Sequence, residues 1–211
     1  MEWISISSPE EGREELERAA RYILRGGLLV YPTETFYGLG ALALDEGAVK
    51  KVFQQKRRPP EKQLTVLISD LDSLREFVVD VPYPARVLAE RFWPGPLTII
   101  LEAKPHLLKS LQAVTAKVGF RISSHPVALE LTKLVGAPIT ATSANVSGNP
   151  PVADPKELPR VFLDGIDMVI DAGKTPGGAP STIVDVTGSE PVILRAGPLA
   201  KDLSGIIKTF S

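Results

Sequence analysis

Residues 26–40 of this 211-residue chain read GGLLVYPTETFYGLG, and this stretch indicates the fold class. The apolar run at 28–31 has the length of a strand, with two glycines before it and Pro32 after it. Apolar runs bounded by such breakers are typical of buried strands. Upstream, residues 9–24 carry apolar side chains at helical spacing behind the capping box SPEE. The order of helix, strand and polar loop predicts an α/β protein.

The same alternation of elements continues along the chain. Further helices are expected over residues 45–55, 84–92, 126–135 and 198–210. Further strands are expected over residues 64–68, 97–101, 118–122, 138–142, 168–172, 183–186 and 192–194. Only residues 187–191 separate the last two strands, a span that favours an antiparallel hairpin. We therefore expect a large mixed sheet.

Length and composition narrow the class of protein. The length predicts a single domain, residues 1–211, with one substantial core. The 24 Lys and Arg residues nearly balance the 25 Asp and Glu residues, so affinity for an anion must come from local clusters of charge. The lack of cysteine excludes disulfides, thiolate metal sites and a cysteine nucleophile, and it is typical of a reducing compartment.

No stretch of the sequence indicates export or insertion into a membrane. The first residues form neither a basic lead nor an apolar signal stretch. The longest apolar runs, such as residues 97–101, are far shorter than the roughly 20 residues that a membrane helix needs. We therefore expect a cytoplasmic protein without membrane association.

The densest group of cations lies between residues 50 and 62. Lys56, Arg58 and Lys62 surround the end of a predicted helix and the Pro59-Pro60 pair. A helix end followed by a proline-stiffened turn would hold these cations in a convergent fan, which suits a polyphosphate. The alternative is a solvated basic helix end, since most charge runs are solvated faces. The prolines and the strand that follows favour a binding site.

Two polar loops follow strands and offer groups to a ligand. In residues 31–40, Thr33 and Thr35 provide hydroxyls, and two glycines permit close approach of the backbone. Residues 143–151 read SANVSGNPP and combine hydroxyls with backbone N–H groups. Ser143 is nearest the strand end, where it can reach a phosphate or a sugar. For both loops, an ordinary polar turn is the alternative.

Two nucleotide-binding motifs are matched only loosely, and we reject both. The glycines at 38–43, with Glu61 downstream, are similar to the dinucleotide fingerprint, but residues 32–37 separate them from the strand end. Gly173-Lys174-Thr175 is similar to the end of a P-loop, but Met168 occupies the position of the required glycine. We expect no nicotinamide binding, and any ATP would bind without a Walker motif.

Isolated charged residues also need an interpretation. Arg121 lies inside an apolar strand, and Arg195 ends another. A cation in such a position is costly unless it is paired or faces a cavity. Structural ion pairs are the alternative, but two such arginines in one sheet favour a shared anion-binding cleft. His106 and His125 adjoin prolines and lack carboxylates at metal-ligand spacing, so we interpret both as structural.

Seven segments within residues 31–198 form a specific ordered pattern. They read YPTETFYGLG, KRRPPEKQLTVLI, RFWPGPLTIIL, VGFRISSHP, SANVSGNPP, STIVDV and ILRAGP. Together they resemble the YrdC-like threonylcarbamoyl-AMP synthases. The resemblance implies a twisted, mixed and mostly parallel sheet, flanked by helices, with a cationic central cavity. It also implies a reaction of L-threonine, bicarbonate or CO₂, and ATP that yields threonylcarbamoyl-AMP and pyrophosphate for tRNA modification.

The resemblance implies the site residues position by position. Lys56 and Arg58 match a catalytic pair of the family. The residues that match ATP-binding positions are Arg58, Lys62, Lys117, Ser143, Pro151 and Arg195. The residues that match threonine-binding positions are Thr35, Arg121 and Ser181. Magnesium is expected to be held through the ATP phosphates, without a metal ligand from the chain, and a tRNA threonylcarbamoyl transferase is the expected downstream partner.

The chain departs from the family pattern in two ways. Part of the family has histidine where this chain has Leu67, and longer members carry an additional C-terminal domain. We therefore expect the short, single-domain form. Two alternatives stay open: an RNA-binding module that uses the same basic concavity, and a paralogue that acts on another carbamoyl or acyl substrate. Weak RNA binding is a further expectation.

Overall fold

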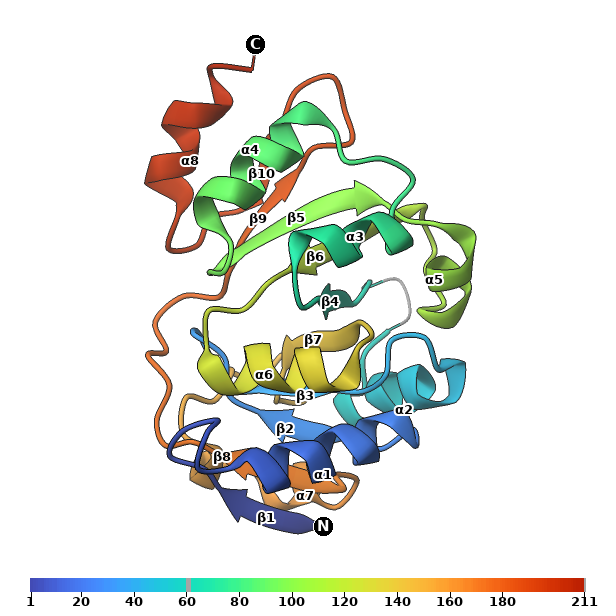
Figure 1. Ribbon diagram of the computed structural model, residues 1–211, viewed down its shortest axis with the longest axis vertical. Coiled ribbons are helices and arrows are strands. Elements are labelled where there is room, and N and C mark those ends of the chain that lie inside the picture. Colours follow the sequence, from blue (N-terminus) through green and yellow to red (C-terminus); the bar gives the residue numbers. More distant parts are fainter. Residues whose placement is uncertain (60–61, 211) are drawn as a thin grey trace.

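A ten-stranded sheet forms the centre of the computed structural model, which describes residues 1–59 and 62–210 (Figure 1). Across the sheet, the strands are β1 (Glu2–Ser5), β8 (Met168–Asp171), β2 (Leu29–Tyr31), β3 (Gly38–Gly40), β7 (Ile139–Ser143), β4 (Thr65–Leu67), β6 (Lys117–Arg121), β5 (Leu97–Glu102), β9 (Thr182–Asp185) and β10 (Val192–Arg195). Segments far apart in the sequence therefore become neighbours. Pro60 of the proline pair and Glu61 lie outside the described residues.

The sheet is mixed, as expected, but parallel pairing does not predominate among the described strands. The parallel pairs are β1–β8, β2–β8, β4–β6 and β5–β9. The antiparallel pairs are β2–β3, β3–β7, β4–β7, β5–β6 and β9–β10. Short connections such as residues 32–37 and 186–191 explain the difference, because a chain that returns within a few residues pairs with itself antiparallel. The last of these pairs confirms the predicted hairpin.

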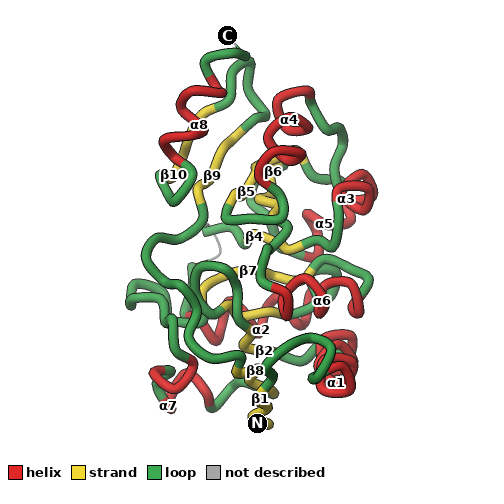
Figure 2. Tube along the Cα trace, turned by 60° about the vertical axis from the view of Figure 1, so that its left-hand side comes forward, coloured by secondary structure: helices red, strands yellow, loops and turns green. Residues whose placement is uncertain are grey.

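The helices pack against the sheet, with α1, α6, α3 and α4 together on one side of it in Figure 2. Their bounds are α1 (Arg13–Leu24), α2 (Glu46–Lys56), α3 (Leu71–Phe77), α4 (Tyr83–Phe92), α5 (Pro105–Ser110), α6 (Pro126–Val135), α7 (Arg160–Leu163) and α8 (Ala200–Ile207), with a 3-10 turn η1 (Pro155–Glu157). The start of α6 gives His125 a structural role, as expected, because its Nδ1 accepts a hydrogen bond from the backbone N–H of Val127. None of the described helices has the length and apolar character needed to cross a membrane.

Alternate residues of β2 enter two different parts of the hydrophobic core. Leu29 and Tyr31 pack in the cluster that includes α1 and α6, whereas Val30 packs in the larger cluster with α2, α3 and α4. A strand buried on both faces is apolar throughout, which explains the continuous run LLVY in the sequence. The strand that first indicated the fold is thus central to both clusters.

The structure corrects several element boundaries. Helix α1 begins at Arg13 and not at residue 9, because residues 8–12 form turns in which the backbone N–H of Glu11 donates to Ser8 Oγ. Helix α8 ends at Ile207, before the expected residue 210. Six short elements were not predicted: β1, β3, α3, α5, α7 and η1. None of them is longer than seven residues, too few to establish a clear periodicity.

Candidate active site

A cavity of about 370 Å³ lies where the ends of several strands and loops converge. Its walls come from the loop after β2, from β4, β5, β6 and β7, and from the segments around β9 and β10. Seven of the predicted site residues line it: Thr35, Arg58, Arg121, Ser143, Pro151, Ser181 and Arg195. The lining has three arginines and, among the described residues, no carboxylate. The clustering of groups separated by more than a hundred residues supports a shared anion-binding site.

Arg58 reaches the cavity because α2 ends just before it. Arg57 adopts a left-handed conformation with φ of 48° and turns the chain out of the helix. The guanidinium of Arg58 then donates from Nε to the carbonyl of Lys62 and from Nη2 to the carbonyl of Gln63, both at 2.7 Å. Burial lowers the pKa of Arg58. These two bonds use neutral acceptors, so they fix the side chain without cancelling its charge.

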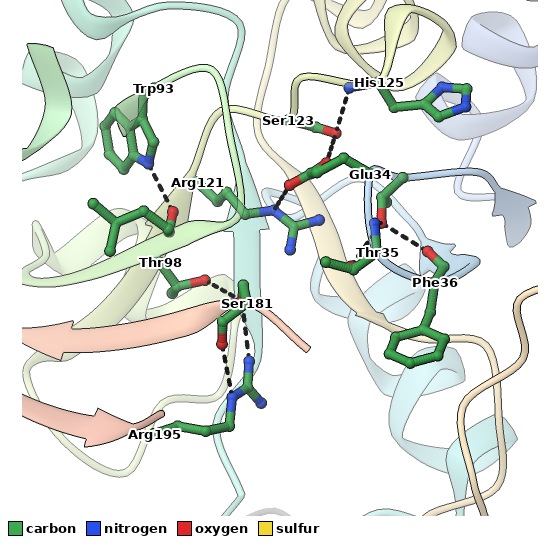
Figure 3. Close-up of polar contacts among 12 residues, drawn as sticks. Glu34, Thr35, Phe36, Trp93, Thr98, Arg121, Ser123, His125, Ser181 and Arg195 are labelled. Carbon is green, nitrogen blue, oxygen red and sulfur yellow. Dashed lines mark hydrogen bonds and ion pairs between the residues drawn. The ribbon is translucent and has the colours of Figure 1, made fainter. Parts of the chain in front are cut away.

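Arg195 also lines the cavity, where it forms a polar network with Ser181 (Figure 3). Its Nε donates to the Ser181 carbonyl at 2.9 Å, and its Nη2 donates to Ser181 Oγ at 3.0 Å. Thr98 Oγ1 lies 2.8 Å from the same Ser181 hydroxyl. Burial lowers the pKa of Arg195, and the charges of Arg121 and Arg58 lower it further. The three guanidinium groups therefore repel one another across one cavity, which an anionic ligand would relieve.

Arg121 is the third cation, and it has a different partner. Arg121 is the last residue of β6, and its side chain is 9% exposed. Its Nε lies 3.5 Å from Oε1 of Glu34, whose side chain is 12% exposed. Ser123 donates a short hydrogen bond to Oε2 of the same carboxylate, and Ser123 Oγ accepts one from the backbone N–H of His125. In Figure 3 the two terminal nitrogens of Arg121 point away from Glu34, on the side of Thr35 and Ser181.

The loop after β2 positions the hydroxyl of Thr35. Thr33 Oγ1 donates to the carbonyl of Phe36 at 2.7 Å and accepts from the backbone N–H of Thr35 at 3.2 Å. The two threonine hydroxyls lie 3.1 Å apart. The carbonyl of Thr35 accepts a hydrogen bond from Gly177, whose φ of 68° suits a glycine. The polar stretch is therefore an ordered wall of the cavity, held by its own hydroxyls and by a distant loop.

Lys56 lies beneath the loop at 143–149 and is not part of the cavity lining among the described residues. Its ammonium donates to the carbonyls of Ser143 and Asn145 and to Oδ1 of Asn145, and the residue is only 2% exposed. Burial lowers the pKa of Lys56 to about 7, with a further contribution from Arg58. Lys56 therefore anchors the loop that carries Ser143, and its catalytic role stays a prediction.

The expected convergent fan of cations is not formed. Lys56 is turned beneath the loop, Arg58 reaches the cavity, and Lys62 is exposed and lies outside the described lining. Because Arg57 is in the left-handed conformation, the side chains of Lys56 and Arg58 point in different directions. Carbonyls of the loop at 143–149 bind the ammonium of Lys56. Lys117 also lies outside the lining, where its Nζ forms a 3.0 Å ion pair with Asp185. Nucleotide contacts from Lys62 and Lys117 thus stay predictions without support from the cavity geometry.

Several polar residues at the site were missed at the level of sequence. Gln63, Thr65, Thr98 and Asn149 line the cavity, and Glu34 holds Arg121 behind it. Thr65 and Thr98 each lie in an otherwise apolar strand, and such isolated hydroxyls are a signal that could have identified them. Glu34 lies within the first polar loop, but its partner is 87 residues away in sequence, and local spacing does not reveal such a pair.

The two loosely matched nucleotide motifs do not adopt the required geometry. Gly38 to Gly40 form strand β3, where the dinucleotide fingerprint requires a turn into a helix. Gly173 lies in the loop after β8, where its N–H donates to the side chain of Asp171. Leu67, at the position where some relatives have histidine, is fully buried in the cluster of α1 and α6. An apolar side chain suits that environment.

Comparisons with known proteins agree with the resemblance. The profile of the Sua5/YciO/YrdC family, described as telomere recombination, matches residues 21–197. The threonylcarbamoyl-AMP synthase of Pyrococcus abyssi is 40% identical over 192 residues, which cover 89% of this chain and 56% of that protein. The threonylcarbamoyl-AMP synthase of Bacillus subtilis is 37% identical over 189 residues, which cover 89% of this chain and 55% of that protein. The chain thus spans about half the length of these two relatives.

A solved structure supports the same assignment. Sua5 of P. abyssi, crystallised with L-threonine, superposes with a TM-score of 0.92 and is 37% identical, covering 98% of this chain and 61% of that chain. The match includes nearly all of the sheet described above. With a family profile that covers most of its length and relatives at this level of identity, the chain belongs to the Sua5/YciO/YrdC family.

Proposed function

We propose that this chain is an L-threonylcarbamoyladenylate synthase. It would convert L-threonine, bicarbonate or CO₂, and ATP into threonylcarbamoyl-AMP and pyrophosphate, and would thus act as a nucleotidyltransferase. The names of the two relatives support the activity, and the L-threonine complex of P. abyssi Sua5 supports the amino-acid substrate. The single observation that carries the proposal is the cavity, where three arginines and several hydroxyls converge.

The cavity residues suit the chemistry of this reaction. The amine of threonine either adds to CO₂ with loss of a proton or condenses with bicarbonate with release of water. One oxygen of the resulting carbamate attacks the α-phosphorus of ATP. The bond from that phosphorus to the bridging oxygen breaks, and pyrophosphate leaves with the bonding electron pair. The barrier consists largely of bringing anions together and stabilising the leaving group. Arg58 and Arg195 can supply positive charge that neutral acceptors have not cancelled.

The proposed roles divide the residues that line the cavity. Arg121, Thr35 and Ser181 would bind threonine, and Arg58, Ser143, Pro151 and Arg195 would bind the nucleotide. No covalent nucleophile is required by this scheme. Lys56 would act by holding the loop that carries Ser143.

Magnesium would be bound through the phosphates of ATP. Among the described residues, no group of three or more His, Cys, Asp or Glu side chains could hold a metal ion, and the cavity lining offers no carboxylate. We assign no step of the reaction to a metal ligand of the protein.

The product determines which reaction must follow. Threonylcarbamoyl-AMP is a mixed anhydride, so a transferase must pass its threonylcarbamoyl group to an adenosine in tRNA before water hydrolyses it. Because tRNA and ATP are both cytoplasmic, we propose that the chain acts in the cytoplasm. Weak RNA binding and action of residues 1–211 as one domain also stay proposals.

Pyrophosphate release tests the proposed function. Purified protein with ATP and magnesium should release pyrophosphate only when both L-threonine and bicarbonate are present. Release with another carbamoyl or acyl acceptor, and not with threonine, would favour the paralogue. Salt-sensitive binding of RNA without any release would favour the RNA-binding module.

A single substitution tests whether the cavity is the site of this reaction. Arg58→Ala should lower turnover at least tenfold, which corresponds to about 1.4 kcal/mol. Arg13→Ala is the matched control, because Arg13 is an exposed helix residue with only an i,i+4 partner. Full activity of the Arg58 variant would exclude this cavity as the catalytic site.

A further inference from the structure

The three arginines of the cavity differ in their counter-charge. Arg121 has the carboxylate of Glu34 at 3.5 Å. Arg58 and Arg195 are held only by backbone carbonyls and a hydroxyl, and among the described residues no carboxylate lies within 4.0 Å of either guanidinium. Arg121 is therefore balanced by a neighbouring carboxylate, whereas the charges of Arg58 and Arg195 are not.

The position of Glu34 is built into the fold. Its Oε2 accepts a hydrogen bond from Ser123, a buried residue, and Ser123 is oriented in turn by the backbone N–H of His125 at the start of α6. Its Oε1 faces Nε of Arg121, and neither of these two buried atoms makes a hydrogen bond within residues 1–59 and 62–210. The carboxylate lies behind Arg121 and is not part of the cavity lining. It therefore acts on a ligand through its charge and through Arg121, without direct contact.

The carboxylate of Glu34 affects which kind of ligand binds beside Arg121. With Nε turned toward Glu34, the terminal nitrogens of Arg121 stay available as a fork for a carboxylate (Figure 3). A zwitterionic amino acid has no net charge, so it can use that fork while its ammonium is attracted by the carboxylate behind it. A phosphate or another simple anion at the same place would be repelled by Glu34, and in a partly dehydrated cavity that repulsion is weakly screened.

We infer that Glu34 is a specificity-determining positioning residue that makes the Arg121 end of the cavity select a zwitterionic amino acid over a simple anion. The inference rests on the proposed function, because it takes the amino-acid end to be at Arg121. Glu34 thereby keeps threonine and the triphosphate in separate places, although both carry anionic groups that arginine binds. Arg58 and Arg195, which lack such a carboxylate among the described residues, would bind the polyanion.

Binding titrations of Glu34→Gln test the inference. The probes are L-threonine, its 2-hydroxy analogue 2,3-dihydroxybutyrate, which lacks the ammonium, and pyrophosphate. The variant should bind L-threonine at least tenfold more weakly, and its preference for threonine over the hydroxy acid should fall at least tenfold. Its affinity for pyrophosphate should stay level or increase. Glu46→Gln is the matched control, because Glu46 is an exposed carboxylate that forms an i,i+4 ion pair with Lys50.

The outcomes separate this inference from the proposed function. If the unmodified protein binds no threonine, both the proposed function and the inference are contradicted. If the unmodified protein binds threonine and Glu34→Gln binds it equally well, the inference alone is overturned. Equal weakening of threonine, hydroxy acid and pyrophosphate would also overturn it, because that pattern indicates a general structural defect.

A second variant keeps the test decisive if Glu34→Gln does not fold. Ser123→Ala removes the hydrogen bond that holds the carboxylate but leaves its charge. We expect a two- to fivefold loss of threonine affinity and an unchanged affinity for pyrophosphate. Unchanged affinity for both ligands would show that the orientation of Glu34 does not matter, and would contradict the inference.

Discussion

Lys56 and Arg121 are two buried cations at the same site, and the chain compensates them in different ways. Three oxygens of neutral groups surround the Lys56 ammonium, and all belong to the loop at 143–149. Arg121 faces a carboxylate from the loop after β2 and keeps its terminal nitrogens toward the cavity. The first cation donates to a loop, and the terminal nitrogens of the second face the cavity. Burial of a cation therefore does not by itself indicate a binding residue.

The largest expected effect comes from removing the loop anchor. Lys56→Met removes the ammonium donor from the buried carbonyl of Asn145, and it takes one of two donors from the carbonyl of Ser143 and from Oδ1 of Asn145. The variant should therefore lower the free energy of unfolding by about 2 kcal/mol. Urea denaturation measures the loss. Lys50→Met is the control, because Lys50 is on the exposed side of the same helix and should change stability by less than about 0.5 kcal/mol. Equal stability of the two variants would remove the distinction between Lys56 and Arg121.

A smaller effect is expected from changing the shape of the second cation while keeping its charge. Arg121→Lys retains the ion pair with Glu34 but loses the fork, so affinity for L-threonine should fall about tenfold, or about 1.4 kcal/mol. Calorimetric titration measures the affinity, and urea denaturation should detect little change in stability. An unchanged affinity for threonine would mean that the guanidinium fork does not contact the ligand.

The smallest effect is a dependence of stability on pH, which arises from deprotonation of Lys56. Burial lowers the pKa of Lys56 from 10.5 to about 7, so above pH 7 the folded chain binds fewer protons at this position than the unfolded chain. The stability of the unmodified protein relative to Lys56→Met should therefore rise with pH, by up to about 1 kcal/mol per pH unit between pH 7 and pH 9. Urea denaturation at a series of pH values measures the slope. A constant difference would show that the carbonyl oxygens keep the ammonium protonated.

Much of the fold was predictable because its strands are apolar runs bounded by glycine and proline. The strand at 29–31, the helix Pro126–Val135 and the terminal hairpin all lie where their patterns indicate. The directions of pairing were not predictable to the same degree, because they depend on which distant strand lies alongside. β7, for example, inserts between β3 and β4 and pairs antiparallel with both.

The residue types available at the site can be read from the amino-acid pattern: arginines in apolar strands, hydroxyl-rich loops and a cationic stretch ended by prolines. How each of these residues is used depends on the packing of distant segments. That packing turned Arg58 into the cavity and Lys56 beneath a loop, and it paired Lys117 with Asp185 and Arg121 with Glu34. The physical reason is that a buried cation takes the orientation in which oxygen atoms compensate it, and here those atoms come from segments 68 to 89 residues away along the chain.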